Sequence, residues 1–248
     1  VYTIYVNMNG NEVLPRLLSK PLLLMTSVFE QGHWLFLCDV LCAEILRRKF
    51  MKNKFVDFKV LATSLCCSVV MGLISFAFLK CLDYAADFRS FFPLCYMFLP
   101  VAGIVTAFVY KRIGGKSSMG NNIIIESAND GEKVPKRLAS LTFIFTCITH
   151  LFGGSVGREG TAVQIGGSLT SNVADYLGFK NNDRSTIVLS GISSAFGSVF
   201  GTPFAGAFFG MEVCCVGRLS AGAVIPCFAC SYLANFVTQL LGLSLIHI

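Results

Sequence analysis

The sequence predicts an all-α, polytopic membrane protein with broken helices, and three observations lead to this fold class. Of the 248 residues, 54% are hydrophobic and only 14% are charged, whereas a soluble domain carries roughly 25% charged residues. Five long stretches contain no Asp, Glu, Lys or Arg, and glycine or proline interrupts several of them. This composition, with a mean hydropathy of +0.67, argues against a soluble enzyme, a disordered protein and a nucleic-acid-binding protein.

The five uncharged stretches are long enough to be membrane spans, because a helix needs roughly 20 apolar residues to cross the hydrocarbon core. They cover residues 60–79, 91–110, 138–157, 185–211 and 219–248. The first three fit a single crossing. The fourth is expected to break into two helices near Gly201-Thr202-Pro203, and the fifth contains Pro226 and runs to the last residue.

The orientation of the spans follows from the basic residues, which give the chain a net charge of +6. Basic residues favour the cytoplasmic side of a membrane. One cluster precedes the first span and another follows the second, while the loop predicted at 83–89 is short and slightly acidic. We therefore expect that loop outside and both clusters in the cytoplasm: Arg47, Arg48, Lys49, Lys52, Lys54 and Lys59, then Lys111, Arg112, Lys116, Lys133, Lys136 and Arg137.

The two ends of the chain do not share the membrane pattern. Residues 1–54 are expected to be an N-terminal extension, either sequence upstream of a start at Met51 or a helix on the membrane surface, and residues 243–248 a non-native tail. The partial membrane domain then covers 55–242. The 11 cysteines lie mostly inside apolar runs, so we interpret them as small packing groups; no metal or other cofactor is expected.

Three glycine-containing segments predict helices that start inside the membrane, at residues 117–126, 153–167 and 201–206. A helix start leaves up to four backbone N–H groups unpaired and carries roughly +0.5 of an elementary charge. Two or three converging starts would make an anion site, as in transporters with broken helices. The alternative is that these glycines only allow close helix packing.

Glu159 is a carboxylate at the start of one of these short helices, where the helix dipole stabilises it. It can occupy an anion site as a tethered mimic of the permeant ion and leave that site when protonated; the alternative is a simple helix cap. Arg158 is interpreted as a structural or pore-rim charge. Glu212 either faces a cytoplasmic vestibule or marks a helix end, and His150 is either a packing residue or a proton relay.

The string GREGTAVQIG at 157–166 resembles the gating-glutamate motif of the CLC family of anion channels and proton-coupled antiporters. Residues 190–196 and 202–212 resemble the two helices that follow this motif in that family. The resemblance implies a fold of two inverted repeats, of which this chain holds mostly the first. It also implies a homodimer in a multi-pass cell-membrane protein, with interface helices at 203–216 and 219–241.

Residues at the first helix start decide the branch of the family. Met119 stands where chloride-handling members usually carry a serine, and Met119, Asn121 and Thr161 resemble the fluoride-exporting branch. The resemblance thus implies fluoride export coupled to proton entry, gated by Glu159; the alternative is a chloride channel or chloride/proton antiporter. The residues expected to bind the anion are Met119, Gly120, Asn121, Asn122, Gly157, Arg158, Gly160 and Thr161.

Other readings compete with this one. Val213 stands where many chloride antiporters carry a proton-passing glutamate, which argues against ordinary chloride/proton exchange. An intramembrane enzyme would need Ser155 or Ser190 as its nucleophile and His150 as its base, and no oxyanion hole or acidic partner is evident. We therefore do not expect this protein to be an enzyme. A purely structural membrane scaffold is the remaining alternative.

Overall fold

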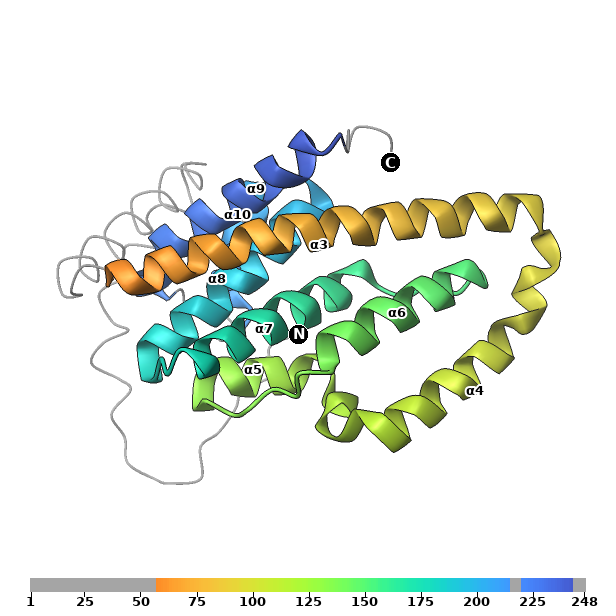
Figure 1. Cartoon of the computed structure of the whole chain (residues 1–248), viewed down its shortest axis with the longest axis horizontal. Helices are drawn as coiled ribbons and strands as arrows, with labels where there is room; N and C mark the ends of the chain where they lie inside the picture. The colour runs from red at the N-terminus through yellow and green to blue at the C-terminus, as the bar shows by residue number, and fades with distance from the viewer. Residues whose placement is uncertain (1–56, 215–219, 243–248) are drawn as a thin grey trace, which may run out of the picture. The chain divides into compact units, whose positions relative to one another are not determined.

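The computed structural model describes residues 57–214 and 220–242 (Figure 1). The expectations for 1–54, Met51 and 243–248 lie outside these residues. Every regular element in the described part is a helix, which confirms the predicted all-α class. The elements are α3 (Phe58–Phe91), η1 (Pro93–Phe98), α4 (Leu99–Val109), η2 (Tyr110–Gly114), η3 (Gly115–Met119), α5 (Asn121–Asp130), α6 (Leu138–Leu151), α7 (Arg158–Tyr176), α8 (Asn181–Phe200), α9 (Pro203–Glu212), η4 (Ala221–Ala223) and α10 (Val224–Leu240).

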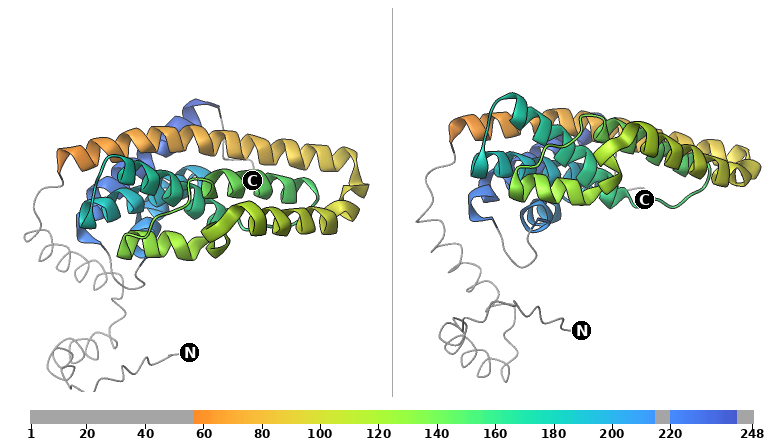
Figure 2. Two further views of the ribbon diagram at one scale, coloured as in Figure 1. Left: turned by 60° about the horizontal axis from the view of Figure 1, so that its bottom comes forward. Right: turned by 90° about the horizontal axis from the view of Figure 1, so that it is seen from below.

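The helix α3 is longer than the predicted span and contains the segment 83–89 that was expected to be a loop. That prediction is wrong because residues 80–91 include no glycine or proline that would break the helix, and Asp83 and Asp87 lie at exposed positions where their charges are not buried. With 34 residues, α3 is about 51 Å long at 1.5 Å per residue, well beyond the ~30 Å hydrocarbon core. It lies along the other described helices in both views of Figure 2.

The second predicted span, 91–110, is divided. Phe92 is extended (φ −124°, ψ 76°), as expected of a residue before proline, and the short 3₁₀-helix η1 turns the chain back so that α4 runs opposite to α3 (Figure 1). Large apolar side chains on α4 are exposed, including Val101, Ile104 and Phe108. Segments 58–91 and 94–130 are each long and apolar enough to cross a membrane.

The third predicted span, 138–157, ends early, because α6 stops at Leu151. Gly153 adopts φ +83°, a conformation that favours glycine. A Cβ atom placed on Gly154 would lie 2.5 Å from Cγ2 of Thr149. Position 154 therefore needs glycine, the residue without a Cβ atom, where the chain leaves α6. Residues 154–157 then form a non-helical linker to α7.

The fourth predicted span breaks where expected. Gly201 ends α8 with φ +67°, and Pro203 is the first residue of α9, which suits proline because the first turn needs no N–H partner. In the fifth, α10 packs on α3, where Thr238 Oγ1 donates to the Gly72 carbonyl over 3.0 Å. Cys227 and Cys230 are fully buried on α10, as expected of packing thiols.

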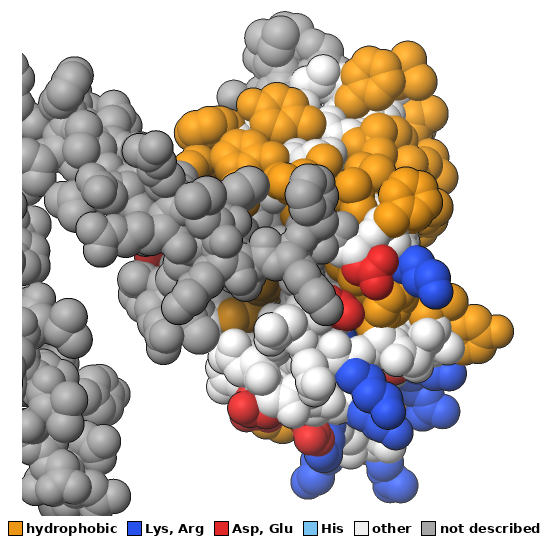
Figure 3. All heavy atoms as spheres, turned by 90° about the vertical axis from the view of Figure 1, so that its left-hand side faces the viewer, with side chains coloured by type: hydrophobic (Ala, Val, Ile, Leu, Met, Phe, Trp, Pro, Cys, Tyr) orange, Lys and Arg blue, Asp and Glu red, His pale blue; other side chains and the backbone are white. Residues whose placement is uncertain are grey.

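Charged and apolar side chains separate on the surface. Figure 3 shows hydrophobic side chains over the upper part of one end of the molecule, and most of the acidic and basic side chains over its lower part. The second predicted basic cluster lies at exposed positions in the structure: Lys111, Arg112, Lys116, Lys133, Lys136 and Arg137. Such a border is expected where a protein passes from lipid to water.

Candidate anion site at two helix starts

The helix α5 starts after a glycine that no other residue could replace without strain. Gly120 has φ +59°, and a Cβ atom on it would lie 3.3 Å from Nε2 of Gln164. Met119, the residue before it, is 39% exposed. Asn121 and Asn122 form the first turn of α5, so their backbone N–H groups have no partner within the helix.

The helix α7 starts after Gly157, at the end of the non-helical linker. Arg158 and Glu159 are its first two residues, and Glu159 is exposed. A Cβ atom on Gly160 would lie 3.3 Å from Nδ2 of Asn121. The first turn of α7 therefore lies directly against the first residue of α5.

The two helices run parallel. Asn121 bonds to Gln164, and Ser127 bonds to Ser171 over 2.9 Å, so both helices advance in the same direction. By this register α7 begins about six residues, or ~9 Å, before the level of Asn121. The positive ends of both helix dipoles thus face the same side, and Asn121 lies beside the first two turns of α7.

The third predicted helix start, that of α9, lies across α8. A Cβ atom on Gly166 of α7 would meet the Gly191 carbonyl at 2.5 Å, whereas one on Gly206 of α9 would meet Gly197 Cα at 2.6 Å and one on Gly210 would meet Ser193 Oγ at 2.0 Å. Residues two apart project ~200° apart on a helix, so α8 presents opposite faces to α7 and α9. These glycines serve close packing, the alternative interpretation.

A chain of side-chain hydrogen bonds fixes Asn121. Gln164 Nε2 donates to Asn121 Oδ1 over 3.0 Å, and Thr142 Oγ1 donates to Gln164 Oε1 over 2.7 Å. Tyr110 OH lies 3.4 Å from Thr142 Oγ1. Sequence reasoning assigned no role to Gln164, Thr142 or Tyr110. The one sequence signal for Gln164 was its position one helical turn after Gly160, on the same face of α7.

Two further predicted residues have hydrogen-bond partners on α6. Thr161 is buried, and its Oγ1 lies 3.1 Å from Thr146 Oγ1 and donates to the Gly157 carbonyl over 3.3 Å. The Thr161 hydroxyl therefore joins α6 to α7 at the start of α7. His150 Nδ1 lies 3.0 Å from the Thr146 carbonyl oxygen, an arrangement that favours the packing interpretation of this histidine.

Glu212 is the last residue of α9, on the far side of α8 from α7, and is exposed. This position fits a helix end, and the predicted role of Glu212 in a cytoplasmic vestibule stays a prediction. Val213 follows it and packs against the apolar core that includes Val188, Ile192 and Met211.

At the other end of α5 and α7, a buried arginine joins three helices. Arg184 of α8 is 5% exposed and donates to Asp175 Oδ1 over 2.6 Å, Ser171 Oγ over 2.8 Å, Ser127 Oγ over 2.9 Å and the Glu132 carbonyl over 3.1 Å. It also donates to the Ser127 carbonyl. This network fixes α5 against α7, and sequence reasoning missed it.

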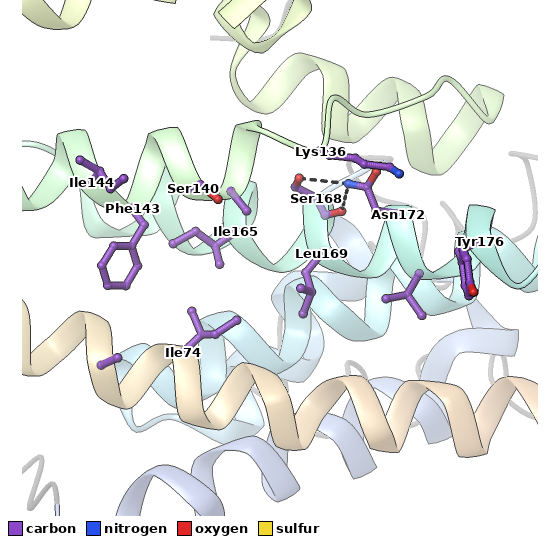
Figure 4. A pocket seen from close by; sticks show the side chains of 13 residues that line it. Ile74, Lys136, Ser140, Phe143, Ile144, Ile165, Ser168, Leu169, Asn172 and Tyr176 are labelled. Atoms are coloured by element: carbon purple, nitrogen blue, oxygen red, sulfur yellow. Dashed lines mark hydrogen bonds between the residues drawn. The ribbon is translucent and has the colours of Figure 1, made fainter. Parts of the chain in front are cut away.

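A hollow of about 700 Å³ lies between α3, α6 and α7, away from the predicted site (Figure 4). Its walls are mainly apolar, and its polar side chains include Lys136, Ser140, Ser168 and Asn172. Asn172 Nδ2 donates to the Ser168 carbonyl over 2.7 Å. No predicted site residue lines it. The lining comprises Ile74, Ala77, Lys136, Ala139, Ser140, Phe143, Ile144, Ile165, Ser168, Leu169, Asn172, Val173 and Tyr176.

Comparison with known families decides the identity of this fold. Residues 101–246 match the family described as "Voltage gated chloride channel". The chain belongs to this family. The predicted resemblance to CLC proteins is thereby confirmed, and the chain is a membrane protein whose relatives are channels and transporters and not enzymes.

Relatives within the family differ in the anions that their names state. A chloride/fluoride channel protein of Pseudomonas syringae pv. tomato is 42% identical over 205 residues, which cover 80% of this chain and 45% of that protein. An H(+)/Cl(-) exchange transporter, ClcA, of Vibrio cholerae is 26% identical over 180 residues, which cover 66% of this chain and 38% of that protein. The chain thus spans less than half the length of these relatives.

Solved structures of the family show the same fold. A CLC-type fluoride/proton antiporter superposes with a TM-score of 0.70 at 32% identity, covering 78% of this chain and 49% of that one. A slow cyanobacterial Cl-/H+ antiporter superposes with a TM-score of 0.59 at 15% identity, covering 74% of this chain and 47% of that one. The broken-helix architecture described above is the architecture of this family.

Proposed function

We propose that this protein exports fluoride in exchange for protons, through an anion pathway gated by Glu159. One observation carries the proposal: α5 and α7 run parallel, and the Asn121 amide at the start of α5 lies beside the first two turns of α7. Two positive helix ends that face the same side favour an anion there.

The donors available at this site suit a small, strongly hydrated anion. They are the Asn121 Nδ2 group and the backbone N–H groups near Asn122 and Thr161, which can replace water around fluoride. The Met119 thioether donates no hydrogen bond. Gly120 and Gly160 leave space for a close approach of the backbone, and Gly157 ends the linker before α7.

Glu159 supplies the coupling between anion and proton. As a carboxylate at the start of α7 it competes with the anion for the same positive helix end. When it takes up a proton, its negative charge disappears and the site accepts the anion. Arg158 keeps its charge and contributes to the rim of the pathway, because a guanidinium does not titrate in proteins.

The names of two relatives support fluoride as the substrate. The 42% identical protein is called a chloride/fluoride channel protein, and the 32% identical structure is that of a fluoride/proton antiporter. The chloride/proton exchange transporter is more distant, at 26% identity. We propose fluoride as the main substrate, with chloride transport as the alternative.

We propose a multi-pass cell-membrane location and a homodimer. The outward face of α9 and α10 carries exposed aromatic side chains, among them Phe204, Phe208, Tyr232 and Phe236. Phe204 and Phe208 pack on Phe228, with ring centroids 5.6 and 5.4 Å apart. Aromatic residues are enriched at interfaces between proteins.

The experiment that tests the function uses the complete reading frame in which this chain is encoded. The purified protein is placed in vesicles loaded with fluoride or chloride, and anion efflux is recorded together with external pH. Fluoride efflux with proton uptake, lost in Glu159→Gln, is the expected result. Chloride efflux as fast as fluoride efflux would refute the fluoride assignment, and the absence of both would refute anion transport.

A further inference from the structure

Four side chains from four elements form one continuous hydrogen-bonded chain that ends at the proposed site. We propose that Gln164 is a positioning residue that sets the preference for fluoride over chloride, because it holds the Asn121 amide with its NH₂ group toward the start of α7. This inference rests on the proposed function, since it takes Asn121 to be an anion ligand.

The polarity of the chain runs in one direction. Thr142 Oγ1 donates to Gln164 Oε1 over 2.7 Å, which leaves the Gln164 NH₂ group to donate to Asn121 Oδ1 over 3.0 Å. The carbonyl end of Asn121 is therefore occupied, and its NH₂ end faces Gly160, where an added Cβ atom would lie 3.3 Å from Nδ2. Tyr110 OH, 3.4 Å from Thr142 Oγ1, can donate to that hydroxyl and complete the series.

The surroundings of Gln164 hold it in place. Thr142 is 5% exposed, and Gln164 and Asn121 are half-buried between α5, α6 and α7. A Cβ atom at position 120 would lie 3.3 Å from Gln164 Nε2. Gly120 and Gly160 thus leave room for the side-chain amides of Gln164 and Asn121. Thr142 sets the orientation of the Gln164 amide.

The orientation of Asn121 matters because an amide has two chemically different ends. With NH₂ toward the site it donates to an anion, and with Oδ1 toward the site it repels one. Fluoride depends more strongly than chloride on a hydrogen-bond donor at a fixed short distance. This is because fluoride is smaller and holds its water more tightly, and the donor must replace that water. Without Gln164, the Asn121 amide can rotate, and the loss falls mainly on fluoride.

A double-mutant cycle in the complete protein tests this inference. The ratio of initial fluoride to chloride efflux is measured for wild type, Gln164→Leu, Asn121→Leu and the double variant. Each single change is expected to lower the ratio about tenfold, the effect of losing one hydrogen bond to a charged group. If Gln164 acts through Asn121, the double variant shows no further loss.

Control variants separate positioning from structure. Gln239→Leu makes the same chemical change at an exposed residue of α10 and should leave the ratio unchanged. Thr142→Ser keeps the hydroxyl and the ratio, whereas Thr142→Val lowers it. If Gln164→Leu does not fold, Gln164→Glu replaces it, because a carboxylate retains the shape but cannot donate to Asn121 Oδ1.

The outcomes distinguish this inference from the proposed function. Failure of the function appears in the wild type, as vesicles that release no fluoride in exchange for protons. The inference fails if wild-type fluoride transport is intact and the ratio of fluoride to chloride efflux is unchanged in Gln164→Leu. It also fails if the double variant lowers this ratio by the product of the two single effects.

Discussion

The two ends of the α5–α7 pair differ in how they are held together. At one end, Arg184 is buried and donates to Asp175, Ser171 and Ser127, which joins α5, α7 and α8. At the other end, the helices start after Gly120 and Gly157, and Glu159 in the first turn is exposed.

The difference separates stability from function along one pair of helices. The Arg184 end fixes the distance and register between α5 and α7, and therefore positions their starts. The first turns of both helices have N–H groups without a partner inside the helix, and the glycines at 120, 157 and 160 leave room for a ligand. Changes at the first end should alter unfolding, and changes at the second should alter transport.

The largest expected effect is at the open end. Gly160→Val places a branched side chain where even a Cβ atom would lie 3.3 Å from Asn121 Nδ2. We expect fluoride efflux to fall to the level of protein-free vesicles while the melting temperature in detergent is retained. Gly103→Val on the exposed α4, where an added Cβ atom meets nothing within 4 Å, is the control. Normal efflux from Gly160→Val would contradict the position of the site.

The next effect is at the closed end. Arg184→Met leaves Asp175, Ser127 and Ser171 without their shared donor. It should lower the free energy of unfolding by on the order of 3 kcal/mol, because the buried oxygens of Ser127 and Ser171 lose hydrogen bonds from a charged group. Denaturant titration of the complete protein measures the loss. Arg112→Met, at an exposed arginine, should change the free energy of unfolding only slightly. Equal losses in the two variants would show that Arg184 does not hold α5, α7 and α8 together.

A smaller effect is expected in the packing between these ends. In Gly166→Ala the new Cβ atom would lie 2.5 Å from the Gly191 carbonyl oxygen, and overpacking of this kind costs about 1–3 kcal/mol. Thermal unfolding checks this, with Gly103→Ala as the matched change at an open position. If both variants melt alike, α7 and α8 are not in such close contact.

The smallest effect concerns an ion pair between Lys116 and Glu132. A hydrogen bond and the charge of Lys116 lower the pKa of Glu132, so the pair stabilises the fold at neutral pH and is lost as pH falls through this lowered pKa. Exposed pairs contribute little, so Glu132→Gln should lower the melting temperature at pH 7 only slightly. A clear drop at pH 7 would show that this pair holds η3 to the loop before α6.

Sequence alone predicted the parts of this molecule that depend on local chemistry. Gly201 and Pro203 predict the break between α8 and α9, and the glycines at 120 and 157 predict where α5 and α7 begin. The prediction of a loop at 83–89 was wrong because the charges in this segment were taken to end a helix that continues to Phe91.

What sequence could not give is which distant polar side chains meet. Arg184 stands in a charged segment beside an apolar one, and nothing nearby identifies Ser127 or Glu132 as its partners. The link between Gln164 and Asn121 likewise spans 43 positions and depends on two helices lying parallel. Such contacts follow from the register of packed helices, which composition does not encode.

Fluoride binding to the complete protein tests the central claim most directly, that an anion is held between the starts of α5 and α7. Isothermal titration calorimetry at fixed pH would compare wild type with Asn121→Leu and the control Gln239→Leu. We expect saturable heat of binding in the wild type and the control, and none in Asn121→Leu. Equal affinity in Asn121→Leu and wild type would contradict the claim.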